Sequence, residues 1–301
     1  MTREPPGRAG SRRADAGTRH GTAESRRDAG EGDATRLDAD AYLQRIGVDP
    51  GTVETADLET LARIQRAHVT AVPFENFAIV GDPDGDAEGE GIVLSTPHLY
   101  EKIVERERGG YCFELNGLFH WLLAELGYDV DRVAARMVGD DGARPPANHH
   151  ANVVRLDRRY VVDVGMGEPT MRRPLPLDGS VRQDEVGVEW RVADSDRPDE
   201  TFRTAFRTSG DDEWSTRYVF SDVPRALDYF EATNDYLQSA PESPFTGKPI
   251  VVIATDDGHR KLSGAELTET VDGEERERTV EDGAYRETLE REFGLQASVF
   301  T

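Results

Sequence analysis

Residues 108–123, RGGYCFELNGLFHWLL, contain the single cysteine of a 301-residue chain, and their pattern predicts a buried helix that begins at Cys112. Gly109 and Gly110 carry a large backbone entropy penalty in a helix, so we expect the helix to start after them. The residues that follow have a helical period, which predicts one continuous buried stripe. The apolar positions of this stripe are Leu115, Leu118, Phe119, Leu122, Leu123 and Leu126.

A thiol in the first turn of a helix lies near unpaired backbone N–H groups and the positive end of the helix dipole. These favour a negative charge, so we expect the pKa of the Cys112 thiol to fall and the thiolate to act as a nucleophile. The alternative is that Cys112 is a small buried hydrophobic residue, which is the commoner fate of a lone cysteine. One cysteine cannot form an intramolecular disulfide, which is typical of a reducing compartment.

Composition and charge exclude several classes of protein. The chain has 59 acidic and 36 basic residues, a formal net charge of −23 and 37% hydrophobic residues. Such a surface repels nucleic acids and acidic membranes, so neither is an expected partner. No run of apolar residues is long enough for a membrane span, and no apolar segment follows the charges of the N-terminus. We therefore expect a cytoplasmic protein; no oligomeric state follows from the sequence.

The acid excess and the scarcity of lysine, found only at positions 102, 248 and 261, suggest adaptation to a cytoplasm of very high salt. The alternative is an acidic protein without this adaptation. Molar KCl screens the self-repulsion of so many carboxylates, so adaptation predicts a higher unfolding midpoint in molar KCl than in dilute buffer. Greater stability in dilute buffer would contradict it.

The chain divides into four parts by composition and periodicity. Residues 1–36 have almost no large apolar side chains and are expected to be a disordered tail. We expect a helical domain at 37–128, with helices near 37–47 and 56–72 and a third capped by Ser95 or Thr96. Strands follow at 129–222, including 188–193 and 201–208, and predict an antiparallel sheet or small barrel. Residues 223–301 predict a linker helix at 223–232, a strand at 250–255 and a terminal helix at about 282–293.

An acidic stretch at 81–91, GDPDGDAEGEG, superficially resembles a calcium-binding loop. Counted from Asp82, the sixth position is Ala87 where a calcium loop has glycine, and the twelfth is Val93 where it has glutamate. We expect an exposed acidic loop and no metal site.

A hairpin supplies candidate partners for the cysteine. His149 and His150 open one strand, a turn follows at 157–159, and Asp163 lies near the end of the next strand among valines. Antiparallel pairing brings the two ends together. A nucleophilic thiol needs a base, and the base needs a group that orients it. Each residue alone has a structural explanation, as a strand end or a turn cap, but the three together favour catalysis.

These stretches closely resemble the arylamine N-acetyltransferase family. The resemblance covers residues from about 37 to the C-terminus and follows the order and spacing of the family's motifs. The matching motifs are PFENF at 73–77, RGGYCFELNGLF at 108–119, PPANH at 145–149, YVVDVGMG at 160–167 and SPFT at 243–246.

The resemblance implies an α+β fold of the cysteine-proteinase type, with a helical N-terminal domain, a central antiparallel β-barrel and a C-terminal α/β lid. It implies a two-step transfer of an acetyl group from acetyl-CoA, a cosubstrate, through an acetyl-cysteine to an aromatic amine or hydrazine, with no bound cofactor. The implied catalytic residues are Cys112 as nucleophile, His149 as base and Asp163 as its orienting group, with His150 as the alternative base. The implied substrate-binding residues are Arg108, Gly110, Phe113, Gly165, Met166 and Gly167.

Two positions depart from the family pattern. Met166 stands where the family usually has Phe, so an aromatic acceptor loses a stacking wall. Glu168 stands where the family often has Gly and would repel the phosphates of CoA if it points into the cleft. The rival interpretations are a papain-like thiol hydrolase or amide synthase with the same triad, and a nonenzymatic acidic scaffold.

Overall fold

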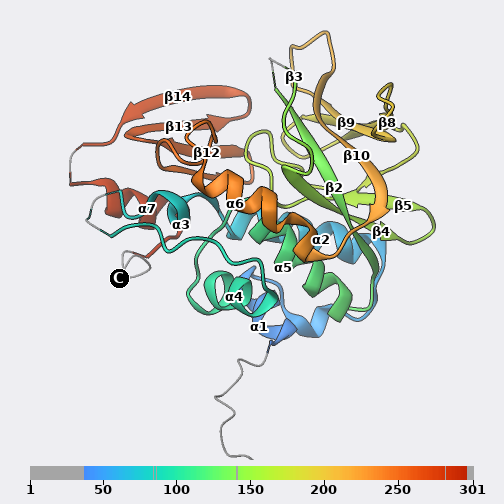
Figure 1. The fold of residues 1–301 in the computed structure, drawn as a ribbon, viewed down its shortest axis with the longest axis horizontal. Helices are drawn as coiled ribbons and strands as arrows, with labels where there is room; N and C mark the ends of the chain where they lie inside the picture. The colour runs from blue at the N-terminus through green and yellow to red at the C-terminus, as the bar shows by residue number, and fades with distance from the viewer. Residues whose placement is uncertain (1–36, 84, 86, 140–141, 282, 297–301) are drawn as a thin grey trace, which may run out of the picture. The chain divides into compact units, whose positions relative to one another are not determined.

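Helices dominate the first described part of the chain. The computed structural model describes residues 37–296 except 84, 86, 140, 141 and 282, so the predicted tail at 1–36 lies outside the described residues. The helices up to residue 128 are α1 (Ala39–Arg45), α2 (Leu58–Ala71), α3 (Phe77–Val80), α4 (Thr96–Tyr100) and α5 (Cys112–Glu125), with a 3₁₀ turn at Pro50–Thr52 and a π-helical turn at Glu101–Glu105 (Figure 1). The predicted helices near 37–47 and 56–72 and the one after Ser95 are confirmed.

Helix α5 is buried on nearly every side. It packs against α1, α4 and two strands of the sheet that follows it. Leu115, Leu118 and Leu122 belong to one apolar cluster, whereas Cys112 and Phe113 belong to another on a different side of the helix. The single stripe predicted from the sequence is therefore too narrow, because a helix that is apolar all round lies in the interior. None of the helices in the described residues has both the length and the apolar character that a bilayer crossing needs.

The middle of the chain forms a nearly closed antiparallel sheet. Its strands are β2 (Asp129–Gly139), β3 (Gly142–Ala143), β4 (His149–Arg155), β5 (Arg159–Val162), β6 (Leu175–Pro176), β7 (Arg182–Gln183), β8 (Glu189–Asp194), β9 (Phe202–Arg207) and β10 (Ser215–Pro224). The order is β6-β5-β4-β2-β10-β9-β8-β7, with β3 paired to β2, and β6 also contacts β8. This barrel-like sheet and the helices confirm the α+β class, and β8 and β9 confirm the two predicted strands.

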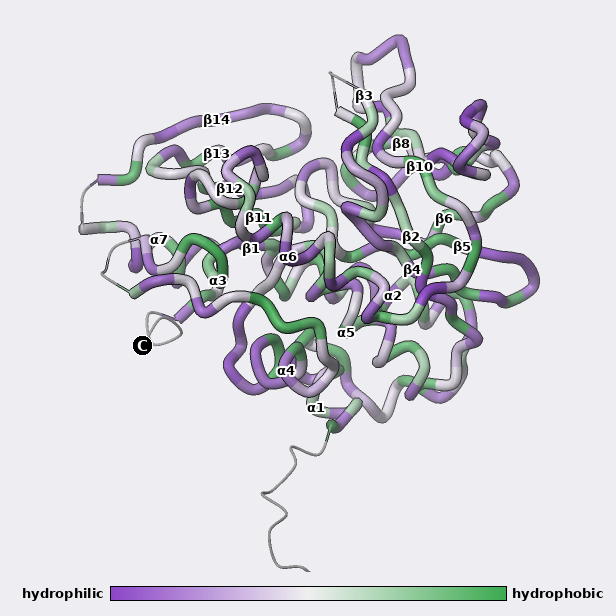
Figure 2. Tube along the Cα trace, viewed as in Figure 1, coloured by the Kyte–Doolittle hydropathy of each residue, from purple (hydrophilic) through white to green (hydrophobic). Residues whose placement is uncertain are grey.

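A second sheet combines the end of the chain with an early segment. Its order is β1-β11-β12-β13-β14, from β1 (Phe74–Glu75), β11 (Ile250–Ala254), β12 (Gly258–Ser263), β13 (Glu266–Val271) and β14 (Glu274–Thr279). Figure 2 shows that the edge strand β14 is hydrophilic along its length, which protects an open edge from pairing with other chains. Helix α7 (Tyr285–Phe293) follows, shorter than predicted.

The connection between the two sheets differs from the prediction of a helix at 223–232. Strand β10 extends to Pro224, a 3₁₀ turn covers Leu227–Phe230, and helix α6 occupies Glu231–Ser239. The predicted helix is therefore misplaced by several residues, because pairing with β2 extends the strand across its expected start.

The side chain of Asn76 joins the early segment to the C-terminal sheet. Its amide nitrogen donates to the carbonyl oxygens of Phe245 at 2.9 Å and Lys248 at 3.0 Å, and its amide oxygen accepts from Ile250 N at 2.8 Å. The described residues, 37–296 with their gaps, belong to one compact unit, and the boundaries predicted at 128 and 222 lie within it and remain predictions.

Candidate active site

The backbone before Cys112 lies tightly against the early segment that leads into β1. Glu75 N donates to Gly110 O at 2.9 Å, and Gly110 N donates to Pro73 O at 3.3 Å. A Cβ atom on Gly109 would lie 2.2 Å from the carbonyl oxygen of Pro73. Gly109 is therefore required by this close approach of two chain segments, which places the start of α5, with Cys112, beside β1.

A network of buried ion pairs surrounds the start of α5. Lys102 Nζ lies 2.7 Å from Glu114 Oε1 and 3.5 Å from Glu75 Oε1, and Arg108 Nη2 lies 3.0 Å from the same Glu75 oxygen. Glu114 Oε2 also accepts a hydrogen bond from Tyr111 N at 3.0 Å, which caps the helix. All these side chains are buried, so the paired charges fix the backbone that carries Cys112.

His149 and Asp163 form a buried hydrogen-bonded pair. His149 Nε2 lies 2.6 Å from Asp163 Oδ2, at the end of the hairpin where β4 pairs with β5. Asp163 Oδ1 accepts hydrogen bonds from Asn116 Nδ2 at 2.8 Å and Gly165 N at 2.9 Å. Burial raises the pKa of Asp163, but the charge of His149 and these hydrogen bonds outweigh it and hold the pKa below its ordinary value. Asp163 is therefore an ionised carboxylate, and in the neutral form of His149 the ring nitrogen that can accept a proton is Nδ1, since Nε2 faces Asp163.

His150 has a different environment from its neighbour. It is fully buried, and its ring stacks on Phe113 with centroids 5.7 Å apart and planes at 17°, and also contacts Phe230. Neither ring nitrogen has a hydrogen-bond partner among the described residues. Burial, followed by the charge of Arg132, lowers the pKa of His150 well below its usual value, so this imidazole is neutral. Of the two histidines, only His149 forms a hydrogen bond with Asp163.

Cys112 is a buried residue, with 3% of its surface exposed. Burial raises its pKa and the charge of Asp163 raises it further, while the N–H of Phe113 at the helix start has a smaller opposite effect. The predicted lowering of the thiol pKa is therefore wrong: desolvation exceeds the effect of the helix start. Among the described residues, Sγ has one polar contact, with Asn148 O at 4.0 Å. The thiol is neutral, and its ionisation requires a base.

Cys112 and His149 line the same cavity, which has a volume of about 580 Å³. Gly165, Met166 and Gly167, which the sequence predicts to bind substrate, form part of its wall. Its other lining residues include the apolar Phe74, Val138, Leu237, Pro244, Phe245, Ile250 and Val252 and the charged Arg144, Glu168, Arg217, Glu242 and Lys261. The arrangement combines a thiol, an imidazole and an apolar wall in one space that a small molecule can enter.

Three of the predicted substrate-binding residues do not line this cavity. Arg108 lies in the buried charge network, Gly110 packs against the segment at Pro73, and Phe113 stacks on His150. We therefore assign these three residues a supporting position behind the start of α5. Gly165, which does line the cavity, also packs against α5: a Cβ there would lie 2.7 Å from Cys112 O, so its missing side chain leaves room for the helix start.

Comparison with known proteins places this chain in a family. The family model for N-acetyltransferases matches residues 57–299. An arylamine N-acetyltransferase of Mycolicibacterium smegmatis is 35% identical over 238 residues, which cover 77% of this chain and 82% of that protein. The chain belongs to the arylamine N-acetyltransferase family. The resemblance found in the sequence motifs is thereby confirmed.

Solved structures of arylamine N-acetyltransferases have the same fold. The Mycobacterium tuberculosis enzyme superposes with a TM-score of 0.75 at 33% identity, covering 87% of this chain and 95% of that one. A Bacillus cereus enzyme superposes with a TM-score of 0.78 at 26% identity, covering 87% of this chain and all of that one. The Bacillus cereus enzyme is described as having a unique Cys-His-Glu catalytic triad.

Glu168, one of the departures from the arylamine N-acetyltransferase pattern, lines the cavity but is paired. Its carboxylate contacts Lys261 Nζ and lies 2.8 Å from His259 Nε2, both on β12. Burial raises the pKa of Glu168, but these two partners outweigh it and lower the pKa to about 2. The predicted repulsion of CoA phosphates is therefore offset by the charge of Lys261.

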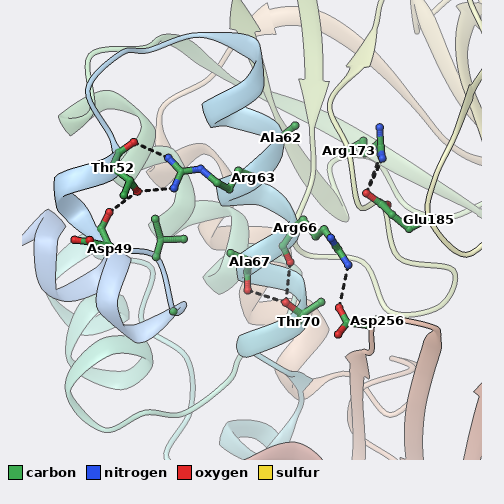
Figure 3. Close-up of a pocket in the computed structure, with 12 residues that line it drawn as sticks. Asp49, Thr52, Ala62, Arg63, Arg66, Ala67, Thr70, Arg173, Glu185 and Asp256 are labelled. Atoms are coloured by element: carbon green, nitrogen blue, oxygen red, sulfur yellow. Dashed lines mark hydrogen bonds and ion pairs between the residues drawn. The ribbon is translucent and has the colours of Figure 1, made fainter.

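A second cavity, also of about 580 Å³, lies near α2 and contains none of this chemistry (Figure 3). Two of its arginines are paired: Arg66 with Asp256 at 2.9 Å and Arg173 with Glu185 at 2.7 Å. The described residues contain no group of three or more His, Cys, Asp or Glu side chains placed to hold a metal ion. Neither feature indicates a second candidate active site among the described residues.

Sequence reasoning missed Asn116 and Tyr218 beside the pair of His149 and Asp163. Asn116 donates to Asp163 and accepts from Val164 N at 2.9 Å, and the ring of Tyr218 lies 5.3 Å from that of His149. The position of Asn116, one helical turn after Cys112 in an apolar helix, was a usable signal. Tyr218 comes from β10, a strand that the sequence pattern did not predict.

Proposed function

We propose that this chain transfers an acetyl group from acetyl-CoA, through a thioester on Cys112, to the nitrogen of an aromatic amine or hydrazine. The observation that carries the proposal is the buried contact of His149 Nε2 with Asp163 Oδ2 at 2.6 Å, in a protein whose Cys112 lines the same cavity as His149. An oriented imidazole and a neutral thiol that line the same cavity support nucleophilic catalysis with a general base. Family membership supports the choice of acetyl donor and of amine acceptor.

In the first half-reaction, His149 Nδ1 takes the thiol proton, and the sulfur of Cys112 attacks the thioester carbonyl carbon of acetyl-CoA. The negative charge of Asp163 stabilises the imidazolium that forms. Backbone N–H groups at the start of α5 stabilise the oxyanion. The carbon–sulfur bond to CoA then breaks, and the CoA sulfur receives the proton from His149.

In the second half-reaction, the amine nitrogen attacks the carbonyl carbon of the acetyl-cysteine. His149 accepts a proton from the amine, and the bond between the acetyl carbon and Sγ breaks. The proton on His149 returns to the sulfur, which restores the starting state. The apolar wall of the cavity, including Phe74 and Phe245, supports an aromatic acceptor.

Steady-state kinetics test this function against the hydrolase with the same residues. CoA release is followed with acetyl-CoA at several fixed concentrations of an arylamine. Parallel double-reciprocal lines and little CoA release without amine support ping-pong transfer. Release that is equally fast without amine identifies water as the acceptor and contradicts the proposal. Absence of any release contradicts it as well.

Paired variants test the choice of His149 as the base. We expect His149→Ala to slow formation of the acetyl-enzyme by about 10²- to 10⁴-fold, because the proton acceptor is lost. His150→Phe keeps the aromatic packing on Phe113 and removes no hydrogen bond, so acetylation should stay within a few-fold of the unmodified protein. Rapid-quench mass measurement of acetylation gives both rates. Loss of acetylation in folded His150→Phe, with His149→Ala still active, would reverse the assignment.

A further inference from the structure

His150 and Arg132 are two buried polar side chains that lack partners on the same side of the barrel-like sheet. Neither ring nitrogen of His150 has a hydrogen-bond partner among the described residues, and the side chain is fully buried. Arg132 on β2 is 9% exposed, its Nε is fully buried, and its guanidinium has no hydrogen bond or ion pair within the described part of the chain. Buried polar groups are normally paired, so these two require an explanation.

The register of β2 and β4 makes the two side chains neighbours. Ala134 lies opposite His150, and Arg132 lies opposite Asn152. Opposite residues point to the same face of a sheet, and a long side chain reaches its diagonal neighbour, so Arg132 and His150 share one face within reach of each other. Helix α5 covers this face and packs against both strands (Figure 1). His120 on α5 contacts Asn152 there, with Nδ1 3.1 Å from Oδ1.

The charge of Arg132 has no carboxylate to balance it. Burial lowers the pKa of Arg132 to about 10, and no acidic group among the described residues opposes this effect. After burial, the charge of Arg132 is the next cause of the lowered pKa of both His150 and His120. Asp131, the acid beside Arg132 in the chain, pairs with Arg155. A buried cation that no acid neutralises is costly, and a water molecule cannot cancel its charge.

The groups without partners include donors suited to an anion. His150 is neutral, so one of its ring nitrogens carries a hydrogen that it can donate. The Nε–H of Arg132 is fully buried, whereas its two Nη groups, which also lack partners among the described residues, are not, so solvent reaches the guanidinium. A guanidinium and an imidazole N–H on one face can donate to the same small anion, and hydrogen bonds to a charged acceptor are strong.

We propose that Arg132 and His150 bind a small anion of the halide class, such as chloride, between α5 and the sheet. The site is separate from acetyl transfer, since neither residue lines the catalytic cavity. A monatomic anion suits it because only 9% of the surface of Arg132 is exposed, and an extended ligand needs wider access. The anion balances the charge of the guanidinium in the folded state alone, so it stabilises the packing of α5 on β2 and β4.

The test is a chloride titration at neutral pH and constant ionic strength, in which gluconate, an anion too large for the site, is the replacement. We expect the urea midpoint of unfolding of the unmodified protein to rise with chloride and to saturate. Arg132→Met and His150→Phe should need at least about 10-fold more chloride for the same rise, as for loss of a hydrogen bond to a charged group. Arg158→Met removes one positive charge from an exposed position, so it is the matched control and should keep the chloride effect.

Crystals grown in sodium bromide locate the anion directly, because bromide scatters anomalously, and we expect a bromide peak between Arg132 and His150. A midpoint that responds equally to chloride and gluconate, or bromide peaks confined to other places, would overturn the inference. If Arg132→Met does not fold, His150→Phe decides, because it keeps the aromatic packing on Phe113. An unchanged chloride effect in that variant would overturn the inference as well. None of these outcomes depends on acetylation, so failure of the proposed function is a separate result.

Discussion

Replacing Asp163 by asparagine is expected to reduce kcat about a thousand- to ten-thousand-fold while leaving the fold intact. The reason lies in the three hydrogen bonds of this carboxylate. Oδ1 accepts from Asn116 Nδ2 and Gly165 N, so the amide oxygen of asparagine must occupy that place. Its NH₂ group then faces His149 Nε2 and donates to it. The ring proton must move to Nδ1, and the imidazole can no longer take the proton of the thiol.

Asp163→Glu is the matched control for this prediction, because it keeps the negative charge. The Bacillus cereus relative is described with glutamate in its triad, so a longer carboxylate is compatible with this family's fold. Since Asp163 is fully buried, the longer side chain must displace neighbours, and we expect activity between those of Asp163→Asn and the unmodified protein. Rates of acetyl-enzyme formation measure both. Equal rates for Asp163→Asn and the unmodified protein would contradict the assigned role.

Lys102→Met is expected to lower the free energy of unfolding by about 3–5 kcal/mol, the usual cost of removing one partner from a buried ion pair. The ammonium group lies 2.7 Å from Glu114 and 3.5 Å from Glu75, and both carboxylates are buried. Methionine fills similar space but leaves the charge of Glu114 without this cation. Urea unfolding at neutral pH measures the loss.

A surface lysine variant and the pH dependence of unfolding show whether the loss of stability in Lys102→Met comes from the lost charge or from altered packing. Lys248 is exposed and has no ion-pair partner among the described residues, so Lys248→Met should change stability by less than about 0.5 kcal/mol. Burial, the largest effect, raises the pKa of Glu114 above its ordinary value even beside Lys102. A carboxyl whose folded-state pKa is raised stabilises the fold at low pH and loses this contribution as pH rises through that pKa. The deficit of Lys102→Met should therefore shrink toward acidic pH; a deficit that grows would contradict the account.

The parts of the fold and site that the sequence predicted are those set by local pattern. The start of α5 at Cys112 follows from two glycines before an apolar helical run, and the hairpin of β4 and β5 follows from alternating valines around a polar turn. Because the hairpin is a local feature, the sequence also predicted that His149 and Asp163 lie close together. The choice between His149 and His150 depended on side-chain orientation, which only the folded strand provides.

What the sequence could not predict depends on contacts between distant segments. The pairing of β1 with β11 joins residues 74 and 252, and no local pattern indicates it. The predicted direction of the pKa shift of the Cys112 thiol was wrong. The shift depends on how deeply α5 is buried, and the sequence of the helix alone does not determine that. The pairing of Glu168 with Lys261 arises in the same way, from a neighbour supplied by another strand.

The central claim is that the sulfur of Cys112, deprotonated by His149, carries the acetyl group between donor and acceptor. Its most direct test is intact-protein mass spectrometry after mixing with acetyl-CoA, followed by peptide mapping and then by addition of an arylamine. The account predicts one acetyl group per chain, on the peptide that contains Cys112, which disappears when the amine is added and is absent from Cys112→Ala. Turnover of the amine by Cys112→Ala, or acetylation confined to another residue, would contradict it.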